Sequence, residues 1–148
     1  ARMKAFTLIE LVIAVAIIAV PASAALPLNE LVVQRAKEQD LRRALREIRT
    51  AIDAYKQASD DGRIVKRVGE SGFPRRLEDL VEGIEDQKSP KRERIYFPRR
   101  VPPDPFGEHW GKRSYASPPE DPKEGEDVFD VYTLAPGRGI NGRPYRDW

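Results

Sequence analysis

One acidic side chain, Glu10, stands inside an apolar run that extends from Phe6 to Val20. A bare charge near the middle of a lipid bilayer costs about 2.5–3.5 kcal/mol even on the lenient scale from insertion experiments. An opposite charge attracts it far more strongly in a low-dielectric environment than in water, and pairing removes the penalty of leaving it alone. The sequence therefore predicts that Glu10 meets a compensating partner.

Few other side chains offer catalytic or ligating chemistry. The chain has no cysteine, which excludes a disulfide framework, a thiolate metal site and a cysteine nucleophile. His109 is the single histidine, and no residues at the right spacing suggest a zinc site or a nucleophile relay, so we assign it to a loop. No nucleophile, base and orienting group stand together in a recognisable pattern. We therefore expect no enzymatic activity, no catalytic residues and no cofactor-binding residues.

A glycine motif near the end of the sequence imitates a nucleotide site. The segment "GRGING", Gly137 to Gly142, has the spacing G-x-G-x-x-G and follows a candidate strand. Dinucleotide binding also needs a helix that receives the pyrophosphate and a later strand with an acidic residue, and neither follows in this sequence. We interpret the three glycines as a tight turn.

A basic and aromatic run, Lys91 to Arg100, has the composition of a groove for single-stranded nucleic acid. Acidic residues lie close to it and its pattern resembles a strand, so the favoured interpretation is a solvated strand edge. The formal net charge of the whole chain is only +2, which is too small to indicate a nucleic-acid partner by itself.

The charge is distributed unevenly along the chain, because residues 11–29 carry none and nearly all of it follows. That run is close to the roughly 20 residues needed to cross a hydrocarbon core. Arg2 and Lys4 precede it, and basic flanking residues favour the cytoplasmic side. The sequence thus predicts a single-pass membrane protein with its N-terminus in the cytoplasm and its C-terminal part exported.

A cleaved secretory signal is the alternative for this region, since residues 22–25 are small and suit its peptidase. Glu10 argues against it, because apolar regions of signal peptides do not normally carry a carboxylate. Pro21 and Pro27 interrupt the run, and each removes a helix hydrogen bond, so we expect a kink or local melting there.

A second helical pattern follows the apolar run. Apolar residues recur at alternating steps of four and three, which places them on one face of a helix packed against a core: Leu41, Leu45, Ile48, Ile52 and Tyr55. Glu38 and Arg42 lie four residues apart on the predicted outer face, and Gly62 is a credible stop. One helix is therefore predicted from near Phe6 to near Asp60.

Beyond Gly62, short segments are separated by proline and glycine. Leu77, Leu80, Val81 and Ile84 predict a short helix after Pro74. The segments "RIYFPRRV" and "DVFDVYTLA" are the best strand candidates, "KRSYAS" is a weaker one, and "PPDPFGEHW" predicts a turn around Asp104. A long helix followed by a few antiparallel strands gives an α+β fold.

The N-terminal segment resembles a known family. "FTLIELVIAVAII", with a basic leader before Phe6 and Glu10 four residues after it, is similar to the N-terminal signature of type IV pilins and type II secretion pseudopilins. Downstream, "SGFPRRLEDLVEG", "VPPDPFGEHW" and "DVFDVYTLAPG" resemble, in that order, segments of the major, G-type pseudopilin head. The absence of cysteine also favours the pseudopilins, since type IV pilins usually close a C-terminal loop with a disulfide.

The resemblance implies a pilin-like fold with four parts: a leader remnant (1–5), a membrane and assembly half of the helix (6–29), an amphipathic half (30–61) and a globular head (62–148). A prepilin peptidase would cut between Ala5 and Phe6 and methylate the new amino group. Glu10 would then attract the ammonium of a neighbouring subunit, and melting near Pro21 or Pro27 would let the packed helix stretch.

The implied function is that of a structural subunit of a periplasmic pseudopilus that drives protein export through a type II secretion system. Its partners would be copies of itself in a helical filament, other pseudopilins, the prepilin peptidase and the inner-membrane assembly platform. It would lie in the bacterial inner membrane, with the head in the periplasm, until it is assembled. The alternative is a type IV (minor) pilin subunit, including one that binds DNA during DNA uptake.

The sequence departs from the family pattern at three places. Ala5 replaces the usual glycine before the cut and would slow processing, and Pro21 is an additional proline. The G-type head carries an acidic calcium-binding loop, whereas "LAPGRGINGRPYRDW" has Asp147 as its sole acid. Calcium prefers six to eight oxygen ligands with several carboxylates. The Leu134 carbonyl and Asp147 are the candidate ligands, and without calcium Tyr145 and Trp148 would anchor the segment by packing.

Overall fold

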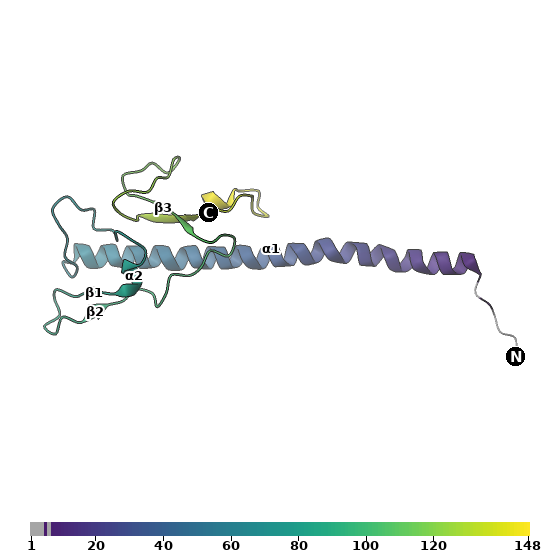
Figure 1. The fold of residues 1–148 in the computed structure, drawn as a ribbon, viewed down its shortest axis with the longest axis horizontal. Coiled ribbons are helices and arrows are strands. Elements are labelled where there is room, and N and C mark those ends of the chain that lie inside the picture. Colours follow the sequence, from purple (N-terminus) through teal and green to yellow (C-terminus); the bar gives the residue numbers. More distant parts are fainter. Residues whose placement is uncertain (1–4, 6) are drawn as a thin grey trace. The chain divides into compact units, whose positions relative to one another are not determined.

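The computed structural model describes residue 5 and residues 7–148, together with their side chains except those of residues 18–26. It contains a helix α1 (Leu8–Asp60), a short helix α2 (Asp79–Glu82), four short strands and a 3-10 turn η1 (Tyr145–Asp147) (Figure 1). The chain divides into two compact units, residues 1–37 and residues 38–148. We call residues 38–148 the C-terminal unit. The order of a long helix and then antiparallel strands confirms the predicted α+β fold.

Helix α1 is 53 residues long and ends at Asp60, just before Gly62, the stop that the sequence predicts. Gly62 has φ +73°, which other residues rarely adopt. The Arg63 N–H donates to the Ala58 carbonyl at 2.9 Å and the Gly62 N–H to the Ser59 carbonyl at 3.0 Å. This pair of bonds is a Schellman motif, which satisfies carbonyls that the last helical turn leaves free.

Both prolines lie within α1, because the helix continues without a break through Pro21 and Pro27. The helix therefore does not melt at these positions in the single chain, while the kink and the stretching of a packed filament at Pro21 or Pro27 stay predictions. A proline removes one backbone hydrogen bond, and the bonds of the turns before and after it can hold a long helix together.

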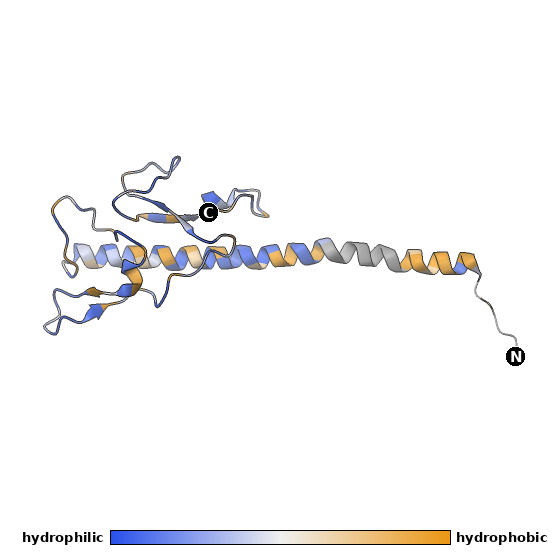
Figure 2. Cartoon of the chain, viewed as in Figure 1, coloured by the Kyte–Doolittle hydropathy of each residue, from blue (hydrophilic) through white to orange (hydrophobic). Residues whose placement is uncertain are grey.

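The N-terminal unit contains the first part of α1. The described apolar side chains of its residues 8–17 are exposed, for example Leu8 at 81% and Ile17 at 68% (orange in Figure 2). Within the part of the chain that the structure describes, no helix meets the combined length and apolarity needed to cross a membrane.

The strands form two separate antiparallel pairs rather than one sheet. Strand β1 (Ile84–Glu85) pairs with β2 (Arg94–Ile95), and β3 (Trp110–Arg113) pairs with β4 (Asp130–Thr133). The candidate at "DVFDVYTLA" is confirmed as β4, whereas β2 covers only the first two residues of "RIYFPRRV", and the third strand begins earlier than "KRSYAS". The short helix is confirmed only as α2, because Gly83 at φ +77° ends it and Ile84 starts β1 instead.

The core of the C-terminal unit is built on one face of α1. All five residues of the predicted stripe are buried there: Leu41, Leu45, Ile48, Ile52 and Tyr55. Leu80 of α2 and Val131 of β4 are fully buried in the same cluster, so the helix and the two sheets share one core. The plain packing role predicted for the stripe is confirmed.

Candidate functional site

The Glu10 carboxylate lies in the first turn of α1 and faces its own helix start. The Thr7 backbone N–H donates to Glu10 Oε2 at 3.3 Å, and the Glu10 N–H donates to the Thr7 hydroxyl oxygen at 3.4 Å. This reciprocal pair is a capping box, in which the residue before the helix and the third helical residue satisfy each other's backbone donors. The sequence signal was present as T-x-x-E in "TLIE", and the sequence analysis missed it.

The other residues of the predicted processing and assembly site are not gathered at this helix start in the described part of the chain. Ala5 is exposed and precedes the helix, and Phe6 lies outside the described residues. Pro21 and Pro27 lie within α1, and Pro27 is exposed. A negative side chain in the first turn is also favourable because the helix dipole is positive at that end.

The C-terminal segment, residues 134–148, is fastened to α1 by a buried carboxylate. Glu38 is only 7% exposed, and its Oε1 accepts hydrogen bonds from the Ile140 N–H at 2.9 Å and the Tyr145 hydroxyl at 3.0 Å. The placement of Glu38 on the outer face beside Arg42 is therefore wrong. Its face is covered by the C-terminal segment, which local helix periodicity does not reveal, and Arg42 lies over the Trp148 ring at 4.4 Å instead.

Arg49 joins three parts of the C-terminal unit. Its Nε donates to Asp130 Oδ1 at 2.7 Å, and one terminal nitrogen donates to the carbonyl oxygens of Val131 and Trp148 at 3.2 and 2.8 Å. One guanidinium group thus links α1, β4 and the C-terminal segment. A planar group with five donors suits such a junction.

The aromatic residues of the segment pack as the sequence predicts. Tyr145 is 5% exposed and stacks on Phe106, with ring centroids 4.4 Å apart. Trp148 meets Tyr145 edge to face at 5.2 Å. The predicted anchoring of the segment by Tyr145 and Trp148 is confirmed.

The candidate calcium ligands do not assemble a site. Leu134 is 60% exposed, and the Asp147 carboxylate lies 3.9 Å from Arg146 Nε. The Asp147 carbonyl accepts from Arg143 at 3.0 Å. Among the described residues, no group of three or more aspartate, glutamate, histidine or cysteine side chains could hold a metal ion. Guanidinium groups stand where a calcium loop needs carboxylates, so the residues present do not fit calcium.

The other residues that the sequence analysis considered as functional sites are His109, the glycine motif and the basic run. His109 is exposed just before β3. The glycine motif forms a turn in which the Gly139 N–H donates to the Arg143 carbonyl at 2.8 Å, and Gly137 has φ +110°. In the basic run, Tyr96 is 62% exposed, and its ring covers the backbone of Gly83 so closely that a Cβ there would lie 2.5 Å from the ring.

An ion pair connects the end of α1 with the β1–β2 hairpin. Two guanidinium nitrogens of Arg63 donate to Asp86 Oδ2 at 3.0 and 2.7 Å, and the Lys88 N–H donates to Asp86 Oδ1 at 3.0 Å. The hydrogen bond from Arg63, aided by that from Lys88, lowers the pKa of Asp86 below its ordinary value. The same pair raises the pKa of Arg63.

A cavity of about 1060 Å³ lies in the C-terminal unit, between Tyr55 and Ser59 of α1 and the loops at residues 65–75 and 114–127. Its polar side chains bond to one another: the Ser71 hydroxyl to Asp127, and Arg75 to Glu70. Phe73 packs at its wall against Tyr115 and Phe129. These polar groups are engaged in holding the loops together.

Comparison with known proteins identifies the N-terminal region. Residues 1–26 match the family described as the prokaryotic N-terminal methylation motif, which is typical of type IV pilin-like proteins, including pseudopilins. The matched residues include Ala5, Phe6 and Glu10. Comparisons of the chain with curated proteins and with solved structures gave no match. The motif supports the pilin-like part of the resemblance, and the G-type assignment stays a prediction.

Proposed function

We propose, from the methylation motif at residues 1–26, that the chain is a structural subunit of a helical pseudopilus that drives protein export through a type II secretion system. The observation that carries the proposal is that this motif leads into a helix of 53 residues with Glu10 in its first turn, and that residues 38–148 form a separate α+β unit. A subunit of this kind needs a long N-terminal helix and a folded head, and the helix α1 and the C-terminal unit suit these roles. The absence of cysteine favours a pseudopilin over a pilin.

Processing creates the partner that Glu10 requires. Hydrolysis of the Ala5–Phe6 peptide bond leaves a carboxylate on Ala5 and an ammonium group on Phe6. Methylation replaces one N–H hydrogen of that group and keeps its positive charge. The ammonium of one subunit then pairs with the Glu10 carboxylate of its neighbour, which relieves the cost of a lone charge in an apolar bundle.

The capping box and the ion pair use the same carboxylate. Glu10 Oε2 accepts the Thr7 N–H at 3.3 Å, and a carboxylate has two oxygens with several acceptor positions. Glu10 thus orients its carboxylate at the helix start in the single chain, and can accept an ammonium group there in the filament.

The first test is the N-terminal residue and mass of the protein purified from membranes. The proposal expects a chain that begins with methylated Phe6. An unmodified chain that retains Ala5 would contradict processing at this bond.

The second test separates the two roles of Glu10. Glutamine at the third helical position also completes a capping box, whereas alanine does not. If the ion pair matters, Glu10→Gln and Glu10→Ala both insert in the membrane and both fail to enter filaments, measured by cross-linking and by imaging of sheared filaments. Normal assembly of Glu10→Gln beside failure of Glu10→Ala would reduce Glu10 to a helix cap. Normal assembly of both would remove it from the mechanism.

The alternative function is that of a DNA-binding minor pilin, and the exposed Tyr96 within the basic run favours it. Two of the arginines there are engaged locally: Arg94 donates to the Glu82 carbonyl at 3.0 Å, and Arg92 lies 3.3 Å from Glu85. Binding of the full chain in detergent to single- and double-stranded DNA, measured across salt concentrations, tests it. Absence of binding at low salt removes this alternative.

A further inference from the structure

A small cavity of the C-terminal unit is lined by an unusual number of cations. The cavity measures about 280 Å³, and we call it the arginine pocket. Its polar and aromatic lining consists of Arg42, Arg46, Arg49, Arg143, Asn141 and Trp148, and no acidic residue lines it among the described residues. Ligand pockets for drug-sized molecules usually start near about 300 Å³, so this one suits a single side chain or a small anion.

Arg49 is the one of these four arginines that has a carboxylate partner in the described structure, namely Asp130 at 2.7 Å. Arg42 lies over the Trp148 ring, and Arg143 donates to a backbone carbonyl. Three guanidinium charges therefore face one small cavity without a carboxylate to balance them.

Arg46 is the least engaged of the four. It is exposed, and no ion pair or hydrogen bond holds it among the described residues. It follows Arg42 by four positions on α1, a spacing at which like charges repel. An anion between these side chains would turn that repulsion into attraction.

The pocket also offers a neutral donor. The Asn141 side-chain oxygen accepts the Arg143 N–H at 3.0 Å, which leaves the amide NH₂ group of Asn141 available to donate. Guanidinium forks bind carboxylates in a bidentate way, and an amide donor beside them adds a further hydrogen bond. The chemistry of the pocket is therefore that of a carboxylate receptor.

The loop between β3 and β4 carries the complementary charge. Its residues 120–127, "EDPKEGED", contain five acids and one lysine, and we call them the acidic segment. Glu120 and Glu126 are exposed and have no ion pair or hydrogen bond among the described residues, and Glu124 reaches Lys112 only at 4.0 Å.

The loop presents Glu120 in a restrained position. Two prolines, Pro118 and Pro119, precede it and fix their own φ angles. The Ser114 N–H donates to the Lys123 carbonyl at 2.9 Å and closes the base of the loop. The backbone that carries Glu120 therefore loses little conformational freedom when the side chain binds.

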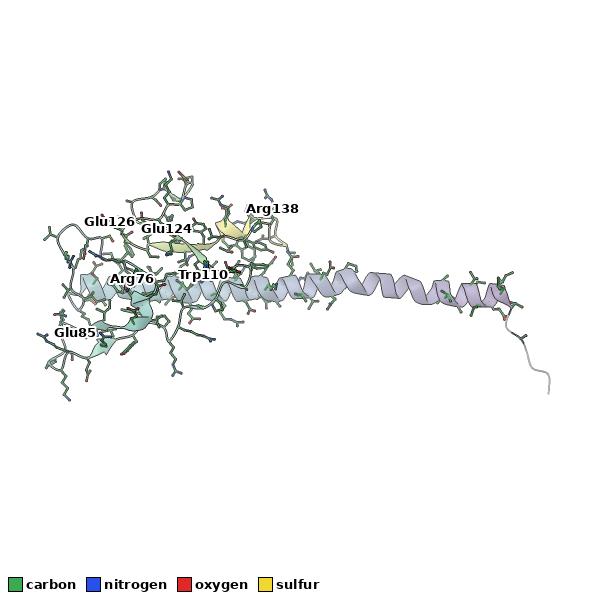
Figure 3. The ribbon with its side chains drawn as sticks, in the orientation of Figure 1. Arg76, Glu85, Trp110, Glu124, Glu126 and Arg138 are labelled. Carbon is green, nitrogen blue, oxygen red and sulfur yellow. The ribbon has the colours of Figure 1, made fainter. Side chains whose placement is uncertain are left out.

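The pocket and the acidic segment lie at different places on the C-terminal unit. Figure 1 shows the β3–β4 loop and the C-terminal segment displaced from one another along α1, and Figure 3 shows Glu124 and Glu126 apart from Arg138. A contact between two different surfaces of identical chains is heterologous and produces an open series of subunits when the rotation does not close a ring.

We propose that the arginine pocket binds the acidic segment of a second copy of this chain, with Glu120 as the inserted carboxylate. The inference rests on the proposed filament and gives its heads a directional contact in addition to the pairing at Glu10. Charge complementarity between the two surfaces fixes which face of one head meets which face of the next.

Cysteine cross-linking of the full chain in membranes tests the contact directly, because the protein has no cysteine of its own. A chain with both Arg46→Cys and Glu120→Cys should form a ladder of oligomers on mild oxidation. Each single variant alone should stay uncross-linked, and a mixture of the two should give dimers. The matched control is Arg43→Cys with Glu120→Cys, because Arg43 is exposed and pairs with Asp40 at 3.4 Å outside the pocket. Equal ladders from Arg43 and Arg46, or no ladder at all, would overturn the proposal.

Exchanging the charges at Arg46 and Glu120 tests how much the proposed contact contributes to filament assembly. Arg46→Glu should lower the yield of sheared filaments by about tenfold or more, since close charge pairs across an interface contribute well above that factor. Adding Glu120→Arg to the same chain should restore it, while Arg43→Glu should leave the yield unchanged. Wild-type yield from Arg46→Glu would overturn the inference and leave the proposed function intact.

The experiments also distinguish two further outcomes, namely failure of the proposed function and binding of phosphate in the pocket. If the wild-type chain forms no filaments, the proposed function fails, and the cross-linking in membranes still decides whether the pocket receives a second copy. If inorganic phosphate raises the thermal midpoint of the full chain and no Arg46–Glu120 cross-link forms, the pocket is a phosphate site and the second-copy contact is overturned.

Discussion

Glu38→Ala should destabilise the C-terminal unit far more than the removal of another glutamate from α1. The carboxylate is 7% exposed and accepts two hydrogen bonds, one of them from a buried tyrosine hydroxyl. Hydrogen bonds to charged groups contribute about 1.5–3 kcal/mol each, and buried donors left without an acceptor cost a similar amount. Because both bonds end on one oxygen and are not independent, we expect a loss of about 3–5 kcal/mol.

Two conservative variants divide that loss. Glu38→Gln keeps a carbonyl acceptor and loses the charge, so it should cost about 1 kcal/mol. Tyr145→Phe removes one of the two bonds and leaves the Ile140 N–H bonded, so it should cost about 1–2 kcal/mol. The double variant Glu38→Ala with Tyr145→Phe should cost less than the sum of the single variants, because the two side chains interact.

The assay is urea unfolding of the full chain in detergent, followed by tryptophan fluorescence. Trp148 packs on Tyr145 and therefore reports on the same contact. With a slope of about 2 kcal/mol per molar urea, a loss of about 4 kcal/mol moves the midpoint by about 2 M. Glu47→Ala, at an exposed position of α1, is the control and should stay within about 0.5 kcal/mol of the wild type. A Glu38→Ala midpoint equal to that of the control would refute the reasoning.

Two other predictions follow from the ion pair at Asp86 and from the C-terminal segment. Because the folded pKa of Asp86 lies below its unfolded value of about 3.9, its contribution to stability is present above about pH 4 and is lost as the pH falls through the folded pKa. Asp86→Asn should therefore be less stable than the wild type at neutral pH, and their stability curves should converge as the pH falls below about 4; parallel curves would contradict this. Calcium and a chelator should leave the melting temperature of the full chain unchanged, because the segment is held by Glu38 and arginines. A large drop with chelator, measured by calorimetry, would restore a calcium site.

The sequence predicts the helical part of the structure well because its signals are local. The stripe from Leu41 to Tyr55 and the stop at Gly62 depend on periodicity and on one backbone angle. The extent of the strands is harder to predict, because a strand exists only where another segment pairs with it. Ile84 suits the helical spacing of Leu77 and Leu80, yet Gly83 ends the helix and Ile95 pairs with Ile84 in a strand.

The N-terminal site was recognisable from "FTLIE" because its chemistry lies within a few residues. The role of Glu38 was not recognisable from the sequence, because its hydrogen-bond partners lie about a hundred residues further along the chain. The helical spacing alone predicts a solvated Glu38, whereas in the folded chain the C-terminal segment covers it. Long-range contacts of single polar residues leave no periodic pattern in the sequence.

The bonds of Arg49 have a consequence for the order in which the C-terminal unit forms. They join positions that are 81, 82 and 99 residues apart in the chain. Contacts of such separation form late, because the chain must first lose the entropy of closing long loops. During synthesis, the junction at Arg49 can close only after Trp148 has been added to the chain. Until then the apolar face of α1 from Leu41 to Ile52 lacks part of its cover, so this interval is when the chain is most exposed to aggregation and proteolysis.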